Sequence, residues 1–342
     1  MILRKFNDET IDNLDLKITN KSIDWNEYYE QYKNVLCFLA QNKENFGIRY
    51  MSFLFIFRHT VELFIKKQYL ITEKTHSIKE LIEKTKELSD DFLLQLDVLR
   101  CDGDGGDFRY ITDKEGNPYF KDDVLCILNP LKYFLNFVDT DIELPNKPKS
   151  RYEIHTSRLR AMGQMATDYD ESVYLIIQGI QENELSINDV YLPLFYLIRH
   201  SMELSLKQSL FNTGKKYLDS KKIEKIKNEH SICRLFNWFN PIIKTALENI
   251  SECDENLKFK QETKDYHIDL EKLKDVIHDL DSNSYYYRFP TDRNGNPHNL
   301  KINTDMLKNI LKFREKVDAY LTFAIPVLQE YGYLESDYEY EQ

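Results

Sequence analysis

Residues 51–66 read MSFLFIFRHTVELFIK, and residues 192–207 read LPLFYLIRHSMELSLK. Each stretch has seven mostly apolar residues followed by the pattern Arg-His-x-x-Glu-Leu-x-x-Lys. An apolar stretch of this length that runs on into helix-forming residues predicts a helix that is buried at its start. Because the whole pattern occurs twice, the two stretches predict two copies of one structural unit.

Two further landmarks repeat in the same order along the chain. His76-Ser77-Ile78 corresponds to His230-Ser231-Ile232, with a leucine three residues later in both copies. Residues 102–118 (DGDGGDFRYITDKEGNP) and 281–297 (DSNSYYYRFPTDRNGNP) are identical at seven of seventeen positions. Three landmarks in one order predict a tandem duplication, and the second copy is longer between its landmarks.

The fold class that we predict is all-α, with two tandem helical bundles of about four helices each that could face each other as a pseudo-dimer. Only 10 of the 342 residues are Gly and 9 are Pro, which favours long helices and short loops. Residues 140–150 contain two prolines and read as a linker between a domain at 1–143 and a domain at 150–342. The helices we expect lie at 24–42, 47–70, from Ser77 onward, 121–139, 152–182, 187–212, 229–248, 257–280 and 302–330.

Charge and cysteine content limit the function classes. With 46 Lys and Arg against 57 Asp and Glu, the net charge of −11 argues against a general nucleic-acid coat protein but leaves room for a local basic groove. The five cysteines are widely spaced and contain no CxxC, which excludes a disulfide framework and a cysteine zinc site and fits a cytoplasmic location. The longest apolar run, at 51–57, is too short to span a bilayer. We therefore expect no membrane contact, no metal and no cofactor.

The repeated polar residues form the first candidate cluster. Arg58 and Glu62 are four residues apart and share one helical face with Lys66, next to His59. A carboxylate on a buried helix needs a partner, and we expect Arg109 to supply it. The cluster is interpreted either as a buried ionic clamp or as a pocket that binds phosphate or carries chemistry. The same alternatives apply to Arg199, His200, Glu203, Lys207 and Arg288.

The second copy carries a further candidate, Arg293, followed after four residues by His298. An arginine can hold a phosphate with two hydrogen bonds, and a histidine can move a proton near neutral pH. The two together suffice for metal-free cleavage of RNA, whose 2′-hydroxyl is an internal nucleophile. The first copy has Tyr119 at the position of His298. A surface turn remains the alternative interpretation, because Gly-Asn-Pro is typical of turns.

The order of these landmarks resembles the HEPN superfamily of small helical-bundle domains. In that family a helix with Glu-x-x-x-Lys precedes a His-x-Leu-x-x-Leu-like helix start and an Arg-Tyr-Pro-Asp-like segment. The matching positions are Glu62, Lys66, His76, Leu81, Arg109, Tyr110 and Asp113 in the first copy, and Glu203, Lys207, His230, Leu235, Arg288, Phe289, Pro290 and Asp292 in the second. The resemblance implies either a metal-independent ribonuclease with an Arg-x4–6-His signature, built by two facing domains, or a relative that binds only nucleotides or partners. The family places this signature at the start of its last helix, whereas here it lies on the Gly-Asn-Pro loop.

Our first hypothesis is therefore a HEPN-type endoribonuclease or toxin-like effector in bacterial antiphage defence. Arg288 and Arg293 would hold the scissile phosphate of RNA, and His298 would act as general acid or base. The second is a non-catalytic tandem module that binds a nucleotide or a protein partner such as an antitoxin, and the third is a plain helical scaffold. A homo-oligomer is compatible with each. The lysines between 215 and 227 are interpreted as a solvated helix face or as a nucleic-acid groove.

Overall fold

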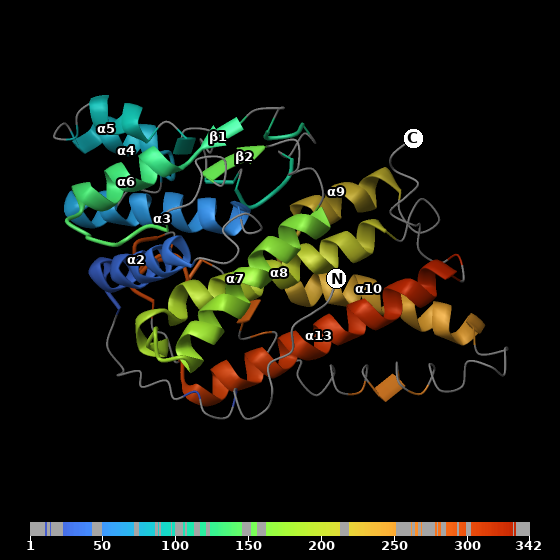
Figure 1. Cartoon of the computed structure of the whole chain (residues 1–342). Coiled ribbons are helices and arrows are strands. Elements are labelled where there is room, and N and C mark those ends of the chain that lie inside the picture. The colour runs from blue at the N-terminus through green and yellow to red at the C-terminus, as the bar shows by residue number, and fades with distance from the viewer. Residues whose placement is uncertain are drawn as a thin grey trace. The chain divides into compact units, whose positions relative to one another are not determined.

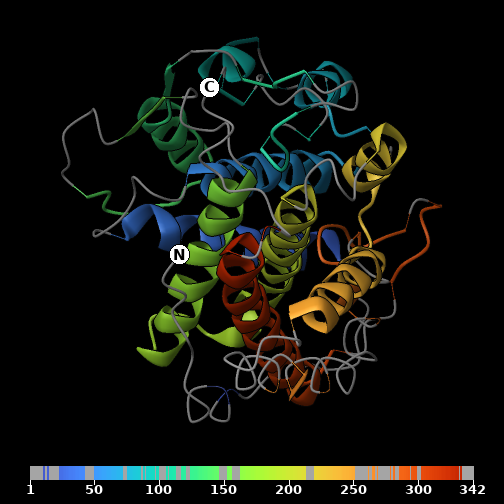
Figure 2. The same cartoon turned by 90° about the vertical axis from the view of Figure 1, so that its right-hand side faces the viewer.

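The computed structural model describes most of the chain. The described residues are 11, 14, 23–42, 50–71, 75–85, 88, 90–96, 98–99, 105–106, 108–112, 117–120, 124–145, 152–155, 162–212, 219–250, 261, 264–265, 268, 278, 280–281, 285–292, 294–298, 302–330 and 332. This part of the chain is mostly helical, as the sequence predicts (Figures 1 and 2).

The chain divides into two compact units. The larger unit comprises residues 18–198 and 285–301, and the smaller unit comprises residues 1–17, 199–284 and 302–342. The division falls inside one helix, α8 (Tyr191–Phe211), which contributes its first residues to the larger unit and the rest to the smaller one. The boundary between the compact units therefore does not lie at 140–150. The boundary between the two predicted repeats at 140–150 stays a prediction.

Two helices, α2 (Trp25–Gln41) and α3 (Tyr50–Gln68), form the centre of the larger unit and pack on each other. Asp24 caps α2 by accepting a hydrogen bond from the backbone N–H of Glu27 at 2.9 Å. The apolar run of α3 is buried on all sides from Met51 to Ile56, which agrees with its nearly continuous hydrophobic sequence. Figure 1 shows α3 lying between α2 and the group formed by α4, α5 and α6.

The helices that cover the other side of α3 are short. They are α4 (Ile78–Thr85), α5 (Asp90–Gln95) and α6 (Leu128–Phe137). The backbone N–H of Glu80 donates to Ser77 Oγ at 3.3 Å, which confirms the predicted helix start at Ser77. Phe134 of α6 packs against Phe57 and Phe64 of α3 and so ties α6 to the central helix.

A small antiparallel sheet replaces part of two predicted helices. Strand β1 (Val124–Cys126) pairs with β2 (Glu153–His155), with Leu125 opposite Ile154. The helix predicted at 121–139 is therefore confirmed only as α6, and the one predicted at 152–182 only as α7 (Met162–Gln181). Pro130 lies in the first turn of α6, where its missing N–H costs no helical hydrogen bond, so it marks a helix start and not a kink.

Helix α7 and the short 3-10 helix η4 (Ile187–Asp189) complete the main helices of the larger unit. Helix α7 packs on α3, and Ser52 Oγ lies 2.6 Å from Ser172 Oγ in a buried contact between them. Small hydroxyl side chains at this crossing let the two backbones approach while satisfying each other's hydrogen bonds.

The smaller unit contains α9 (Ser220–Asn228), α10 (Ile232–Ile250) and α13 (Thr304–Glu330) besides the end of α8. The lysines of α9 are exposed and Ile226 is buried, so α9 is an amphipathic helix with a basic exposed face. The predicted helix at 257–280 lies mainly outside the described residues. Pro326 lies inside α13 without ending it.

Candidate functional site

Four polar residues gather around a buried carboxylate in the larger unit. Glu62 has a side chain that is 1% exposed, and its Oε2 lies 2.6 Å from the guanidinium of Arg58 and 3.7 Å from Nδ1 of His59. Its Oε1 lies 2.9 Å from Nζ of Lys66 and 2.8 Å from Nδ1 of His76. We call these residues the Glu62 cluster. Helix α3 supplies Arg58, His59, Glu62 and Lys66. His76 lies just before the start of α4.

The charge state of Glu62 follows from its neighbours. Burial alone would raise the pKa of this carboxyl group. The charges of Lys66 and Arg58 and the contacts with His59 and His76 outweigh burial and hold the pKa well below its usual range. Glu62 is therefore an ionised hydrogen-bond acceptor, and Nδ1 of His76 donates to it.

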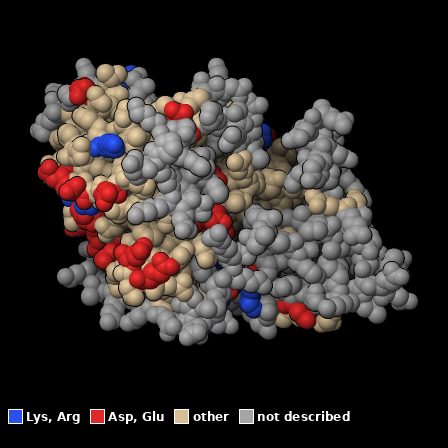
Figure 3. Space-filling model, in the orientation of Figure 1, with Lys and Arg blue, Asp and Glu red and all other residues tan. Residues whose placement is uncertain are grey.

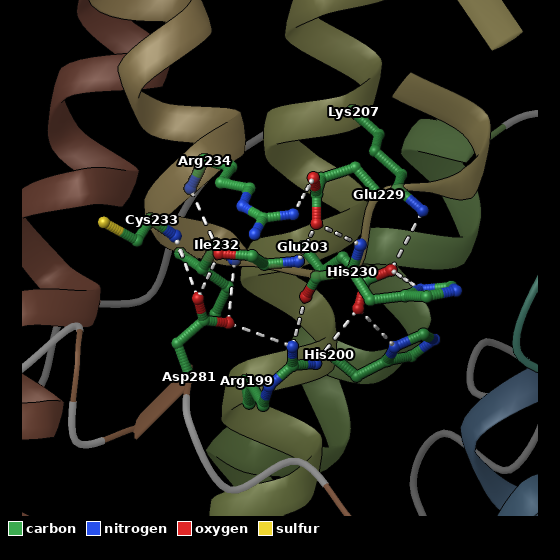
Figure 4. Close-up of polar contacts among 11 residues, drawn as sticks. Arg199, His200, Glu203, Lys207, Glu229, His230, Ile232, Cys233, Arg234 and Asp281 are labelled. Carbon is green, nitrogen blue, oxygen red and sulfur yellow. Dashed lines mark hydrogen bonds and ion pairs between the residues drawn. The ribbon is translucent and has the colours of Figure 1, made fainter. Parts of the chain in front are cut away.

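The smaller unit holds a cluster with the same contacts, drawn in Figure 4. Glu203 lies 3.0 Å from the guanidinium of Arg199, 3.0 Å from Nζ of Lys207 and 3.0 Å from Nδ1 of His230, with Nδ1 of His200 at 3.8 Å. In both clusters the arginine also donates to the backbone carbonyl of the α4 or α10 histidine, His76 or His230. We call this set the Glu203 cluster.

Asp281 adds a second carboxylate to the Glu203 cluster. It lies 3.1 Å from the guanidinium of Arg199 and accepts hydrogen bonds from the backbone N–H groups of Ile232 and Cys233. The side chain thus caps the start of α10 while pairing with the arginine (Figure 4). This role was not predicted, because Asp281 is 49 residues from Ile232 in the sequence.

The clusters correct one prediction about Arg109. The partners of Glu62 are Arg58, His59, Lys66 and His76, and the expected Arg109 is not among them. Arg109 instead donates from Nε to the carbonyl of Gly105 at 2.6 Å. Gly105 has a φ of +74° and lies against Arg58, so that a Cβ there would come within 3.2 Å of the guanidinium carbon. The first-copy loop therefore covers the cluster with its backbone.

The segment 285–289 of the second copy packs on α2 and α3 of the larger unit. Nε2 of His59 lies 3.0 Å from the carbonyl oxygen of Arg288, and the hydroxyl of Tyr32 donates to the carbonyl of Tyr287 at 3.0 Å. The ring of Phe289 lies over Nζ of Lys66 at 4.9 Å and 5.0 Å from the ring of His76. The second-copy segment thus forms an aromatic cover over the Glu62 cluster.

Arg288 lies among aromatic rings in the same unit. Its guanidinium carbon is 5.5 Å from the ring centre of Tyr285 and 5.6 Å from those of Tyr196 and Phe289. Burial and the nearby positive charge of Arg109 lower the pKa of Arg288.

His298, the predicted general acid or base, lies among tyrosine rings. Its ring packs on Tyr286 with centroids 4.6 Å apart and lies 6.5 Å from the ring of Tyr285. Burial lowers the pKa of His298, so its ring is neutral near pH 7, and its Nε2 is buried without a hydrogen-bond partner. Arg293 lies outside the described residues.

Isolated bridges occur at corresponding positions beside the two Gly-Asn-Pro sequences. An isolated bridge joins Thr112 to Pro118 in the first copy and Thr291 to Pro297 in the second. In the second loop Asp292 accepts hydrogen bonds from the backbone N–H groups of Asn294 and Asn296. His298 therefore follows a closed turn and is not part of a helix start.

Acidic side chains gather on one face of the larger unit. Figure 3 shows acidic side chains gathered over α2 and the turn after α7, and Glu27, Glu182 and Glu184 are among the exposed ones. This face repels phosphate groups. Within the described parts of the chain, no three His, Cys, Asp or Glu side chains are grouped so as to hold a metal ion. No helix among the described residues has the length and apolar character needed to cross a membrane.

Comparison with protein-family models, with curated protein sequences and with solved structures finds no match to this chain. The functional interpretation therefore depends on the residues and their geometry.

Proposed function

We propose that this chain is a HEPN-like protein of two duplicated helical units that binds RNA at Arg288 and Arg109 of the larger unit. The observation that carries the proposal is the position of Arg288, whose guanidinium carbon lies 5.5 Å from the ring centre of Tyr285 and 5.6 Å from that of Tyr196. A guanidinium binds a phosphate oxygen pair with two hydrogen bonds.

The aromatic surroundings favour RNA as the source of that phosphate. Single-stranded RNA is recognised largely by stacking of its splayed bases on aromatic rings and arginine planes. Arg288 lies against Tyr285 and Tyr196, and the guanidinium carbon of Arg109 lies 5.4 Å from the ring of Tyr110. Arginines and tyrosines in one place supply both interactions that such a ligand needs.

The duplication is supported by the two polar clusters. Arginine, histidine, glutamate and lysine occur at the same spacing in α3 and α8, and each glutamate contacts the corresponding histidine of the following helix start. Unrelated helices would have no reason to share this set of contacts. The clusters themselves are closed ion-pair networks, which favours a structural role for Arg58, Glu62, Arg199 and Glu203.

The test is the affinity for a short single-stranded RNA, measured with Arg288→Gln and with a matched control. Arg234→Gln removes the same charge from an arginine that is 71% exposed on α10 of the smaller unit. We expect Arg288→Gln to weaken binding about tenfold or more and to reduce the salt dependence by about one counterion, whereas Arg234→Gln binds like wild type. Equal affinity of all three folded proteins would contradict the proposal.

A second candidate function is metal-independent cleavage of the bound RNA by a toxin-like effector of antiphage defence. It is favoured by His76, whose ring centroid lies 6.4 Å from that of Tyr285, a residue that also contacts Arg288. The test is cleavage of RNA in EDTA by wild type and by Arg288→Gln. Cutting that persists in EDTA and is lost with Arg288 would support this function. Binding without cutting would leave the chain a non-catalytic module that binds RNA, a nucleotide or a protein partner.

A further inference from the structure

His76 is held in one orientation by three contacts in the larger unit. Its backbone carbonyl accepts a hydrogen bond from Arg58, its Nδ1 lies 2.8 Å from Glu62, and its ring packs on Phe289 with centroids 5.0 Å apart. A side chain fixed in this way has little rotamer freedom left to lose when it meets a ligand.

The contact with Glu62 also decides which ring nitrogen carries the proton. Glu62 is ionised and buried, so it accepts a hydrogen bond and Nδ1 of His76 must donate it. In the neutral ring the lone pair then lies on Nε2. No described residue forms a hydrogen bond with Nε2, and the side chain is 30% exposed. The available nitrogen of His76 is therefore the basic one.

The position of His76 places this nitrogen beside the proposed RNA site. The ring of Tyr285 has its centroid 6.4 Å from that of His76, and the guanidinium carbon of Arg288 lies 5.5 Å from the same Tyr285 ring. An RNA base stacked at Tyr285 with its phosphate on Arg288 would bring its ribose close to His76.

We infer that His76, oriented by Glu62, is the general base that removes the proton from the 2′-hydroxyl of RNA bound at Arg288. The inference rests on the proposed RNA-binding function and on its second, catalytic form. It assigns to His76 the proton transfer that the sequence suggested for His298.

The reaction that this assignment implies is transesterification within the RNA. Nε2 of His76 takes the 2′-hydroxyl proton while the 2′-oxygen forms a bond to the neighbouring phosphorus. The bond from phosphorus to the 5′-oxygen breaks, and the leaving 5′-oxygen takes a proton from water. His76 then returns its proton to the solvent, so that the products are a 2′,3′-cyclic phosphate and a 5′-hydroxyl end. Arg288 neutralises the charge that develops on the phosphate oxygens.

The other histidines of the larger unit near Tyr285 are poor candidates for this step. His298 has its Nε2 buried and its ring packed on Tyr286. His59 is fully buried between Phe55 and Tyr32, and burial lowers its pKa to about 4. Nε2 of His59 is also already engaged by the carbonyl oxygen of Arg288 at 3.0 Å.

The decisive variant is His76→Asn. The asparagine amide can donate to Glu62 from nearly the position of Nδ1, whereas nothing replaces Nε2. We expect His76→Asn to bind RNA like wild type but to cleave about 100-fold more slowly or worse in EDTA. Added imidazole should restore part of the cleavage in the smaller variant His76→Gly, because a free base can enter the vacated space.

A matched control lies in the smaller unit. His230 contacts Glu203 as His76 contacts Glu62, whereas Tyr285 and Arg288 belong to the larger unit. His230→Asn should therefore cleave like wild type. Unchanged cleavage by folded His76→Asn, or an equal loss in His76→Asn and His230→Asn, would overturn the assignment.

The readouts separate this inference from the proposed function. If wild type binds RNA and does not cut it, the assignment of His76 fails and the binding function stands. If wild type does not bind RNA, the proposed function fails and the assignment fails with it.

Discussion

The Glu62 and Glu203 clusters contain the same four α-helical side chains and the same histidine contact, but they are covered by different groups. Phe289 lies over Lys66 and His76 in the Glu62 cluster, whereas Asp281 pairs with Arg199 in the Glu203 cluster. The histidine at the helix start is 30% exposed in the first and 55% in the second. The shared contacts are what each helix pair needs to bury its glutamate. The two clusters therefore differ in the groups that cover them and agree in the contacts of the glutamate.

The largest expected effect tests what the clusters share. Glu62→Ala and Glu203→Ala each leave a buried arginine and lysine without their carboxylate, which should reduce the free energy of unfolding by about 3–5 kcal/mol. Denaturant unfolding measures both variants, with Glu83→Ala on the exposed face of α4 as a control that should change it by less than about 0.5 kcal/mol. If the free energy of unfolding fell by less than about 1 kcal/mol in only one of the two variants, the clusters would differ in their contribution to stability.

The pH dependence of stability comes from His59, which is buried in the first cluster. Burial lowers its pKa to about 4, whereas the unfolded chain binds the same proton near pH 6.5. The unfolded state therefore binds more protons between these values, and stability falls as pH drops through this window, by at most about 3 kcal/mol. Urea unfolding across this range should show the loss in wild type and a flatter profile in His59→Phe. Identical profiles would contradict the assignment.

Asp281 tests the difference between the clusters. Asp281→Ala removes a carboxylate that pairs with Arg199 and caps α10, and we expect it to cost about 2 kcal/mol. Amide hydrogen exchange should increase at the start of α10 and stay unchanged in α3. Equal protection of α10 in wild type and variant would show that the cap contributes nothing.

The smallest effect concerns the aromatic cover of the Glu62 cluster. Tyr32→Phe leaves the carbonyl of Tyr287 without its donor, and we expect a loss of about 1 kcal/mol in thermal unfolding. Tyr28, whose hydroxyl donates to the carbonyl of Tyr286, offers a parallel variant with the same expected loss. No change in either variant would mean that the segment 285–289 is held by ring packing alone.

The helices and the short-range contacts were predictable from the sequence. The apolar runs of α3 and α8 and the Arg58–Glu62 and Arg199–Glu203 spacing depend only on the helical repeat. The capping at Ser77 depends on residues three positions apart and was also predicted.

The contacts between distant segments could not be predicted in this way. Arg109 donates to the carbonyl of Gly105, and Arg288 lies beside Tyr285 and Tyr196. Both contacts depend on which loop packs on which helix, and no local sequence pattern encodes that packing. Tyrosine hydroxyls that donate to backbone carbonyls, as Tyr32 does, have no sequence signature either. The β1–β2 pairing was missed because each strand is three residues long.

The most direct measurement of the central claim is where RNA touches the protein. A short single-stranded RNA containing 4-thiouridine would be cross-linked to the intact chain by light, and the modified peptides would be mapped by mass spectrometry. The account predicts cross-links in the larger unit, at Tyr285 and the residues around Arg288 and Tyr110. Cross-links confined to the exposed lysines of α9 in the smaller unit, or no specific cross-link at all, would contradict it.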